Sequence, residues 1–381
     1  MEINIEELHH ANEVKITVVG VGGGGCNTVN HIIQHGVDGD IKLVSMNTEA
    51  KALKSVTAHS KIQLGENTTR GFGAGMDPKV GRASAEESHD IILEELKDSH
   101  IVLVTTGLGG GTGTGAAPVI AKIAREEVKA LTIAVITKPF GYEGAMRAKV
   151  AEEGLKDIRE AVDVFIMIPN EKLGSVVDKG LGFKDSFKIV NDVTAQAIKG
   201  IASFILNGNG DGISIDFADL NTIMKFKGLG LIGIGEKDGE DSAVEAVKEA
   251  LESPLLDNVS INGAKGAIVY YEINEKYPFH KLQEANYIVQ QQVDKDAFLK
   301  IGHMWNNELS PTQIKVTLVI TGFEKGIVQT NAENKEEAKE TENAKIPNIR
   351  RLKLAVGGGT RNSGADYSEI DTPIFLREQQ D

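Results

Sequence analysis

The chain has 381 residues, of which 55 are acidic and 41 basic, so its formal net charge is −14. This charge would repel polyanions, and we therefore expect no nucleic-acid partner. The single cysteine, Cys26, cannot form an internal disulfide, and the first residues lack a basic and apolar leader; together these features favour a cytoplasmic location. No stretch approaches the roughly 20 apolar residues that span a bilayer, so we expect no direct membrane insertion.

The first half of the chain alternates short β-branched runs with longer helical patterns. The apolar runs are nearly continuous, which is typical of strands buried on both faces of a parallel sheet. Helical spacing between them indicates crossover helices, so we predict an α/β fold with helices on both faces. The predicted strands are 14–20, 41–47, 101–107, 131–137 and 162–169, and the predicted helices cover 27–36 and begin after Gly115, near Glu143 and after Pro169.

A long helix and a second, smaller unit come next. Apolar residues recur at helical spacing from 183 to 206, which predicts one central helix joining two domains. The pattern then returns to short strands and helices, which indicates a mixed α/β unit. The predicted strands are 228–239, 266–273, 298–305 and 315–323, with helices at 243–254 and 282–293.

The C-terminal part changes in composition. Residues 331–345 are too charged and too poor in apolar side chains to bury a core, which indicates disorder. The chain then finishes with an apolar cluster, Ile374, Phe375 and Leu376, and a cluster on a tether is typical of a docking peptide. The predicted division is a flexible N-terminus at 1–13, an N-terminal domain at 14–182, the central helix at 183–206, a loop at 207–220, a C-terminal domain at 221–323, a disordered linker at 324–370 and a partner-binding peptide at 371–381.

The first predicted strand runs into a glycine-rich loop, VVGVGGGGCN. Gly20, Gly22 and Gly25 satisfy G-x-G-x-x-G between a strand and a helix, the Rossmann dinucleotide pattern. Such an enzyme would also need an acidic residue about 20 positions further on, and Glu49 follows the second strand there. The pattern therefore leaves two possibilities, a nicotinamide-dependent oxidoreductase and a tight turn without a ligand.

A second glycine-rich loop follows a later strand of the same domain. Residues Gly109–Gly115 would let backbone N–H groups approach anionic oxygens, with hydroxyls from Thr112 and Thr114 and the N-terminus of the next helix. A Walker A loop would need lysine and then serine or threonine after its last glycine, where Ala116 and Ala117 stand. The loop therefore predicts a phosphate cradle that is not a P-loop, and two such loops favour a nucleotide with several phosphates.

The sequence GGGTGTG after a strand resembles the tubulin signature. Further segments are similar to the tubulin/FtsZ family, namely GVGGGGCN, MNTEAKAL, GFGAGMDPKVG, TKPFGYEGAMR, IPNEKL and DFADLNTIM. The resemblance extends from about Val14 to Phe323, and DTPIFLR is similar to the family's C-terminal peptide. It implies a Rossmann-like parallel-sheet GTPase domain, a long central helix, a smaller α/β C-terminal domain, and a disordered linker and tail. It also implies a GTPase that polymerises head to tail and organises the bacterial division ring at mid-cell.

The resemblance further implies which residues hold GTP. Phosphates would lie against the two glycine loops, Ala74 and Gly75 near the γ-phosphate, and Phe187 and Asn191 against the guanine. Mg²⁺ would be bound through the phosphates, and no set of protein ligands for a metal is predicted. The implied nucleotide-binding residues are Gly22, Gly23, Gly24, Asn27, Asn47, Ala74, Gly75, Gly109, Gly110, Gly111, Thr112, Gly113, Glu143, Arg147, Asn170, Phe187 and Asn191.

Several of these residues also have a plain structural interpretation. Glu143 and Arg147, implied to contact ribose and phosphate, have the i, i+4 spacing of a surface ion pair on a helix. Phe187 could be a core residue, and Asn170, implied to contact guanine, could be the N-cap of the helix after Pro169. From the residues alone, both interpretations stay open.

The segment ISIDFADLNTIM carries two acids three residues apart, Asp216 and Asp219. If a helix begins there, Asp216 is a natural N-cap and Asp219 a favourable first-turn charge. The resemblance instead makes both residues catalytic: the loop enters the site of a neighbouring subunit, where the two acids position and polarise the attacking water. Ser214 departs from the asparagine that is usual in the family.

The resemblance implies two kinds of partner. One is the chain itself, in a head-to-tail homopolymer, and the other is membrane-tethering and regulatory division proteins bound through Asp371–Arg377. A nucleotide-gated scaffold that assembles with little hydrolysis is a further alternative.

Overall fold

The computed structural model describes residues 14–36, 40–176, 183–206, 216–226, 228–253 and 264–323, which belong to one compact unit. The expected flexible N-terminus, the linker at 324–370, the terminal peptide and Ser214 lie outside these residues. No helix within the described ranges is both long and apolar enough to span a membrane.

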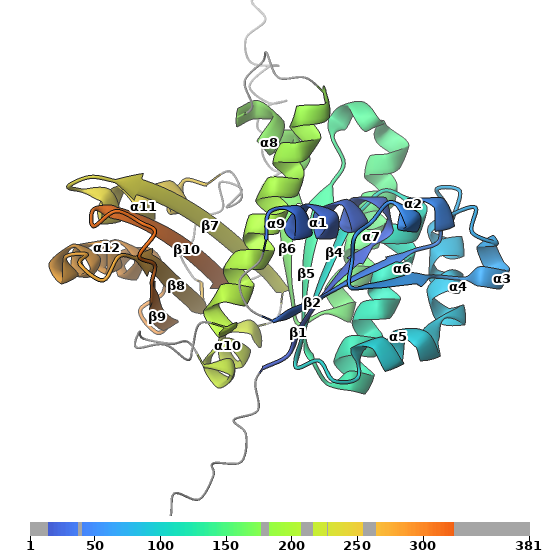
Figure 1. Cartoon of the computed structure of the whole chain (residues 1–381), viewed down its shortest axis with the longest axis horizontal. Coiled ribbons are helices and arrows are strands. Elements are labelled where there is room, and N and C mark those ends of the chain that lie inside the picture. Colours follow the sequence, from blue (N-terminus) through green and yellow to red (C-terminus); the bar gives the residue numbers. More distant parts are fainter. Residues whose placement is uncertain are drawn as a thin grey trace, which may run out of the picture. The chain divides into compact units, whose positions relative to one another are not determined.

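The described chain alternates strands and helices as far as α9 (Figure 1). The strands are β1 Ile16–Val21, β2 Ile41–Asn47, β3 Ser60–Gln63, β4 Ile101–Gly107, β5 Leu131–Lys138, β6 Val164–Pro169, β7 Gly228–Asp238, β8 Gly266–Ile273, β9 Phe298–Trp305 and β10 Gln313–Thr321. The helices are α1 Gly22–Gln34, α2 Ala50–Lys54, α3 Glu66–Thr69, α4 Pro78–Glu87, α5 His89–Leu96, α6 Gly111–Lys122, the π-helix η1 Ile123–Val128, the 3₁₀ turn η2 Gly141–Glu143, α7 Ala145–Ala161, α8 Asn170–Val176, α9 Phe183–Leu206, α10 Phe217–Met224, α11 Ser242–Leu251 and α12 Phe279–Gln292.

The strands form one ten-stranded sheet in the order β3-β2-β1-β4-β5-β6-β7-β10-β8-β9. Strands β1 to β6 pair in parallel, which confirms the predicted parallel sheet. The order 3-2-1-4-5-6 is that of the doubly wound nucleotide-binding fold, with its topological switch point between β1 and β4. Ligands of such folds bind at the carboxyl ends of the strands beside this point.

Strand β7 joins two kinds of sheet. Its residues Gly228–Gly230 pair in parallel with β6, whereas Leu231–Asp238 pair antiparallel with β10. Strand β10 then pairs antiparallel with β8, and β8 in parallel with β9. The second unit is therefore mixed α/β, as predicted, with helices α11 and α12 contributing to its own core.

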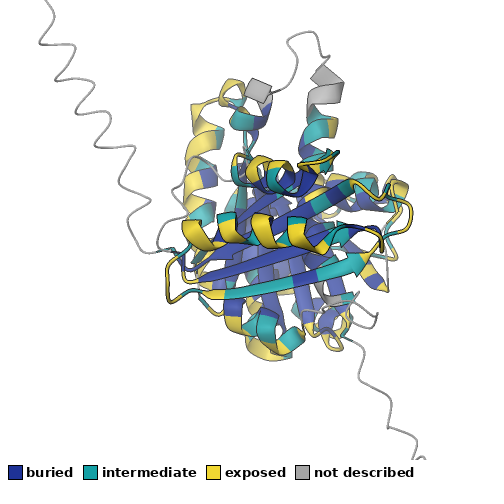
Figure 2. Ribbon diagram, turned by 90° about the vertical axis from the view of Figure 1, so that its left-hand side faces the viewer, coloured by how far each residue is buried: buried dark blue, intermediate teal, exposed yellow. Residues whose placement is uncertain are grey.

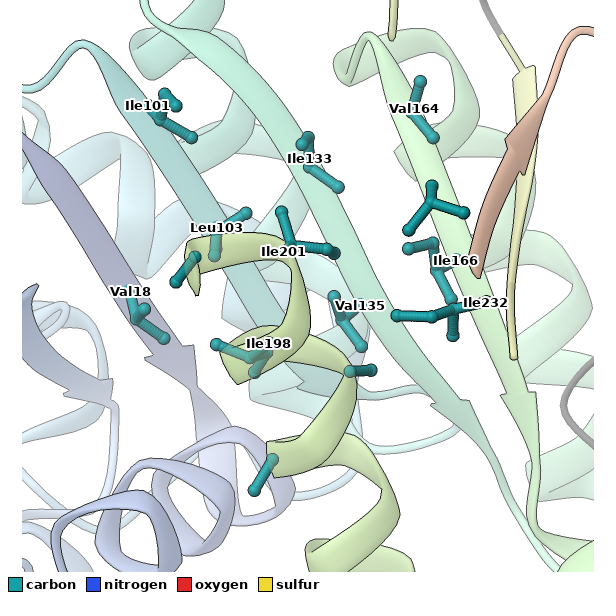
Figure 3. Close-up of a cluster of buried hydrophobic side chains, with 14 of the residues drawn as sticks. Val18, Ile101, Leu103, Ile133, Val135, Val164, Ile166, Ile198, Ile201 and Ile232 are labelled. Carbon is teal, nitrogen blue, oxygen red and sulfur yellow. The ribbon is translucent and has the colours of Figure 1, made fainter. Parts of the chain in front are cut away.

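Separate cores cover the two faces of the parallel sheet. On β1, Ile16 and Val18 belong to one core, whereas Val19 and Val21 belong to the other, because successive strand residues point to opposite faces. Helices α1 and α9 pack on the first face, where Ile198 and Ile201 of α9 lie against strand residues (Figure 3). Helices α5, α6 and α7 pack on the second face. Figure 2, viewed from the side of α11 and α12, shows buried strands behind helices whose outward faces are exposed.

The predicted elements are present, and others were missed. The central helix has the predicted limits, 183 to 206, whereas α12 begins at Phe279 rather than near Leu282. Between β2 and β4 no element was predicted from the sequence, yet α2, β3, α3, α4 and α5 lie there. Asp77 starts α4 as its N-cap by accepting a hydrogen bond of 2.9 Å from the Lys79 N–H, directly before a proline at the first helical position.

Candidate functional site

A cleft of about 590 Å³ opens at the carboxyl ends of β1, β2, β4 and β5, next to the switch point. The segments that leave these strands line it, and α9 closes it with Phe187, Val190 and Asn191. Of the predicted nucleotide-binding residues, all but Gly22 and Gly109 line this cleft. Segments far apart in sequence are thus brought together where the fold places ligands.

Two helices begin at the cleft without a side-chain cap. The N-cap positions of α1 and α6 are Val21 and Gly110, and neither side chain accepts a hydrogen bond from its helix. Neither helix has an acidic residue in its first turn. The first N–H groups of both helices are therefore available to an anion, and the helix dipoles favour negative charge there.

Gly22 supports the cleft without lining it. Its φ is +70°, and a Cβ at this position would lie 2.9 Å from the backbone nitrogen of Gly113. The two glycine loops consequently touch each other at this point. A second link is the hydrogen bond of 2.6 Å between the hydroxyls of Thr48 and Thr112, which ties the segment after β2 to α6.

The predicted phosphate contact of Gly109 is not supported by the geometry. Its N–H donates a hydrogen bond of 2.9 Å to the hydroxyl of Thr114, so this N–H is already used within the loop. The Thr114 hydroxyl, expected to donate to the ligand, is buried and accepts this bond instead. Gly109 is glycine for a conformational reason, since its φ is +95° and a Cβ would lie 2.8 Å from the carbonyl oxygen of Arg147.

The glycine run therefore serves two purposes. A Cβ on Gly110 would meet no atom within 4 Å, so this glycine leaves open space in the cleft. A Cβ on Gly115 would lie 1.9 Å from the carbonyl oxygen of Pro78, so this glycine allows α6 to pack closely on α4. Only part of the run is explained by access to a ligand.

The segment before α4 lies beside the start of α6. Ala74 is buried in the wall of the cleft, and a Cβ on Gly111 would lie 2.9 Å from its methyl group. Gly75 and Met76 both adopt positive φ, which gives the segment a sharp turn. Met76 and Phe72 are 65% and 87% exposed, so the rim of the cleft presents two large apolar side chains to solvent.

Glu143 and Arg147 form the expected ion pair, with 2.7 Å between Glu143 Oε2 and Arg147 Nη1. The pair is not carried by one helix, because Glu143 ends the 3₁₀ turn and Gly144, with a φ of +101°, separates it from α7. The Glu143 carboxylate also accepts a hydrogen bond of 2.8 Å from the Phe140 N–H. Arg147 Nε is buried in the cleft wall without a hydrogen-bond partner.

Asn170 does not cap a helix as its structural interpretation predicted. It is the first residue of α8, so the position before the helix is occupied by Pro169. Its Oδ1 is buried without a hydrogen-bond partner, and Asn170 lines the same cleft as Phe187 and Asn191 of α9. A buried polar atom without a partner is costly, and a ligand in the cleft would satisfy it. Phe187 packs edge-on against Phe140, with ring centroids 5.5 Å apart.

The cleft contains little positive charge. Among the residues that line it, Arg147 is the only lysine or arginine, and it is accompanied by the carboxylates of Glu49 and Glu143. A polyphosphate bound here would therefore depend on backbone N–H groups and hydroxyls, with its charge only partly neutralised by the chain.

The acids of α10 lie outside this cleft. Asp216 is the N-cap of α10 and accepts a hydrogen bond of 2.7 Å from the Asp219 N–H, and Asp219 pairs with Lys300 of β9. Phe217 packs against His100, which directly precedes β4, so α10 lies at the amino ends of the strands. The cleft is at their carboxyl ends, and Figure 1 shows α8 and α10 at opposite ends of α9.

Comparison with known families decides the relationship. Residues 15–178 match the model of the Tubulin/FtsZ family, GTPase domain, and residues 228–324 match that of the FtsZ family, C-terminal domain. The chain is 42% identical over 368 residues to a cell division protein FtsZ of Helicobacter pylori strain J99, covering 96% of this chain and 93% of the relative. The chain belongs to the FtsZ family. As an FtsZ-family member it is a tubulin-like GTPase of cell division that binds GTP and GDP, which excludes the oxidoreductase alternative.

Solved structures agree with this assignment. The FtsZ dimer of M. jannaschii matches with a TM-score of 0.76 and 42% identity, covering 83% of this chain and 90% of that one. The CetZ2 protofilament of Haloferax volcanii matches with a TM-score of 0.71 at 19% identity, covering 87% and 100%, which shows a shared fold alone.

Some cleft residues of this FtsZ-family chain were missed by the sequence analysis. They include the hydroxyl residues Thr106 and Thr137 at the ends of β4 and β5, and Phe72 and Met76 on the rim. The threonines could have been found, because residues at the carboxyl ends of parallel strands line the ligand site. The two rim residues lie in GFGAGMDPKVG, which the resemblance marked through Ala74 and Gly75, but no secondary structure was predicted there that would have placed their side chains on the rim.

Proposed function

We propose that GTP is hydrolysed between two copies of the chain stacked head to tail, the cleft of one facing α10 of the next. The observation that carries this proposal is the separation of the cleft from Asp216 and Asp219. Strand β4 alone has seven residues, and at about 3.3 Å per residue it puts about 20 Å between the two edges of the sheet. The acids cannot reach a nucleotide in their own cleft, but a second copy can supply them.

Each copy would contribute what the other lacks. Backbone N–H groups at the starts of α1 and α6 would hold the phosphates, with Arg147 as the cation of the cleft, and Asn170 Oδ1 would accept a hydrogen bond from the base. Asp216 and Asp219 of the next copy would orient the attacking water and polarise it. Phosphoryl transfer needs mainly positioning and charge stabilisation, so this division of roles suffices chemically.

Magnesium fits this cleft as a partner of the phosphates. Arg147 alone would neutralise only part of the negative charge of a nucleoside triphosphate. Hydroxyl and backbone groups predominate around the two glycine loops. Mg²⁺ keeps several waters and binds through phosphate oxygens, where it supplies the missing positive charge.

Stacking in one direction is supported by the rim of the cleft and by relatives. Phe72 and Met76 would be covered by the next copy, which removes apolar surface from water. The solved M. jannaschii FtsZ is a dimer, and the solved H. volcanii CetZ2 is a protofilament. A head-to-tail contact uses two different surfaces and does not close, so it yields filaments. We further propose that these filaments form the division ring at mid-cell, tethered through Asp371–Arg377.

The division of the chain into a GTP-binding domain at 14–182 and a C-terminal domain at 221–323 also stays a proposal. It is supported by the family models, which cover 15–178 and 228–324. The two parts share the strand β7, so we describe them as parts of one sheet.

The test is GTP hydrolysis per subunit measured against subunit concentration, with light scattering recorded in the same samples. A shared site predicts that specific activity rises steeply together with scattering. A flat dependence, with monomers as active as polymer, would refute the shared site. Strong scattering with little phosphate release would instead favour the nucleotide-gated scaffold.

A further inference from the structure

Two histidines and an aspartate meet on the surface where α1 lies beside α9. His31 is in the last turn of α1, His35 is the residue that caps the carboxyl end of this helix, and Asp192 is on α9. One ligand atom from each residue lies within 4.8 Å of the other two. Across the described ranges this is the only group of three histidine, cysteine, aspartate or glutamate residues arranged so closely.

The helix geometry directs both imidazoles to one face. Residues four apart on a helix are neighbours, and the two rings stack with their centroids 4.0 Å apart. His31 Nε2 is in direct ion-pair contact with Asp192 Oδ1. The three side chains are therefore already gathered without a bridging ion.

A hydrogen bond to the backbone orients the second imidazole. His35 Nδ1 lies 3.0 Å from the carbonyl oxygen of His31, and because a carbonyl oxygen only accepts, Nδ1 must carry the hydrogen. In the neutral ring, Nε2 then holds the lone pair. Metal-binding histidines commonly donate their other ring N–H to a backbone carbonyl in this way, which fixes the ring and its tautomer.

We propose that His31, His35 and Asp192 bind a divalent transition-metal ion of the zinc class. Two imidazoles and one carboxylate match the ligand preference of Zn²⁺, whereas Mg²⁺ prefers oxygen ligands throughout. Tetrahedral ligands at bond lengths of about 2.0–2.1 Å lie about 3.4 Å apart, so small side-chain rotations would bring the group together. The ion would replace the hydrogen between His31 Nε2 and Asp192, and this hydrogen would pass to Nδ1 or to water.

The surroundings leave room for further ligands. The Asp192 side chain is 46% exposed and His35 is exposed, so water can complete the coordination. Lys199 Nζ donates a hydrogen bond of 3.4 Å to the His35 carbonyl oxygen, so this ammonium lies beside the site.

A bound ion would cross-link two helices that both contribute to the cleft. Helix α1 begins with Gly22–Gly24 at the phosphate end, and α9 brings Phe187 and Asn191, the neighbour of Asp192 in the chain, to the other side. The ion would hold these helices at a fixed separation and so stabilise the folded chain.

The test is competition for Zn²⁺ between the full-length protein and a chromophoric chelator, together with the melting temperature with and without Zn²⁺. His35→Ala removes one exposed ligand, and Asp192→Asn keeps the shape but removes the charge. We expect either variant to weaken binding by at least about tenfold and to abolish the rise in melting temperature. Both variants should melt near the wild type without metal, and excess Mg²⁺ should not displace the ion.

The matched control is a variant with His9→Ala and His10→Ala, since this adjacent pair also offers two imidazoles. It should bind Zn²⁺ as the wild type does. The proposal is overturned if the wild type binds no Zn²⁺, if His35→Ala and Asp192→Asn bind it with unchanged affinity, or if only the control variant loses binding.

Discussion

Asp219→Ala separates two roles of one carboxylate. In the chain itself Asp219 pairs with Lys300, and the two side chains are 33% and 34% exposed. A pair that is partly open to water contributes about 0–1 kcal/mol, so its loss should lower the melting temperature by no more than about 4 °C. A group that places and polarises the attacking water contributes about 10²–10⁴-fold to the rate. We therefore expect GTP turnover per subunit to fall at least about hundredfold while the fold persists.

Lys300→Ala is the matched control, because it breaks the same ion pair and leaves the acid in place. It should shift the melting temperature about as much as Asp219→Ala and keep most of the GTPase activity. Phosphate release and thermal melting on both variants decide the question. Equal loss of turnover in the two variants would refute the catalytic role and make the ion pair responsible.

Mixing two inactive variants tests whether the acid acts on the neighbouring copy. Gly110→Asp would place a carboxylate in the open part of the cleft, so this variant keeps an intact α10 but binds GTP at least about tenfold more weakly, and the assay is run at a GTP concentration that leaves its cleft largely empty. In random filaments of equal parts with Asp219→Ala, about a quarter of the contacts join an intact cleft to an intact acid, so about a quarter of wild-type activity should return. Activity no greater than that of the separate variants, with both present in the filaments, would show that the acid and the cleft must belong to one copy.

Three further predictions concern single side chains. Gly110→Asp should weaken GTP binding at least about tenfold with little change in melting temperature, because the φ of −99° at Gly110 is ordinary and a Cβ there would meet no atom within 4 Å. Gly115→Ala should instead lower the melting temperature, because its Cβ would collide with the Pro78 carbonyl oxygen, and it should change GTP binding by the folded chain little. Equilibrium binding and thermal melting distinguish the two. Hydrogen bonds, the strongest of them from the Thr68 hydroxyl, lower the pKa of Glu87 from its ordinary 4.5 to about 2. The ionised Glu87 carboxylate therefore stabilises the folded chain above about pH 4.5, and this stabilisation is lost as the pH falls toward 2. Glu87→Gln should reduce the acid dependence of unfolding in that window, and an unchanged pH profile would contradict this. Burial raises the pKa of Cys26 to about 11, so a thiol reagent at neutral pH should modify it only in denaturant, as mass spectrometry can measure; rapid labelling of the folded chain would be the contrary result.

The sequence predicted best where periodicity was strong and long. The central helix was found because its apolar residues recur at helical spacing, and the buried strands because their apolar runs are nearly continuous. Helix α4 was missed, since PKVGRASAEE contains few apolar residues and its helix depends on the Asp77 cap and on close packing against α6. Propensity alone does not reveal a helix that is stabilised in this way.

The nucleotide cleft likewise contains features that the sequence predicts and features that it does not. Its glycine loops were recognisable because the backbone needs of a phosphate site restrict the residue type. The packing role of Gly115 could not be recognised in the same way, because its contact with Pro78 depends on α4, which had not been predicted. The grouping of His31 with Asp192 depends on how α1 lies against α9, and nothing local in the sequence encodes that contact.

Strand β7 is shared by the parallel and the antiparallel parts of the sheet, and among the described residues its ladder with β6 comprises Gly228–Gly230 alone. Two of these three residues are glycines, which add no side-chain packing of their own to the seam. In the proposed filament, strain carried along the sheet under a bending load would therefore concentrate at this short ladder. It is the place where the two ends of a subunit could change their mutual tilt with the fewest hydrogen bonds broken.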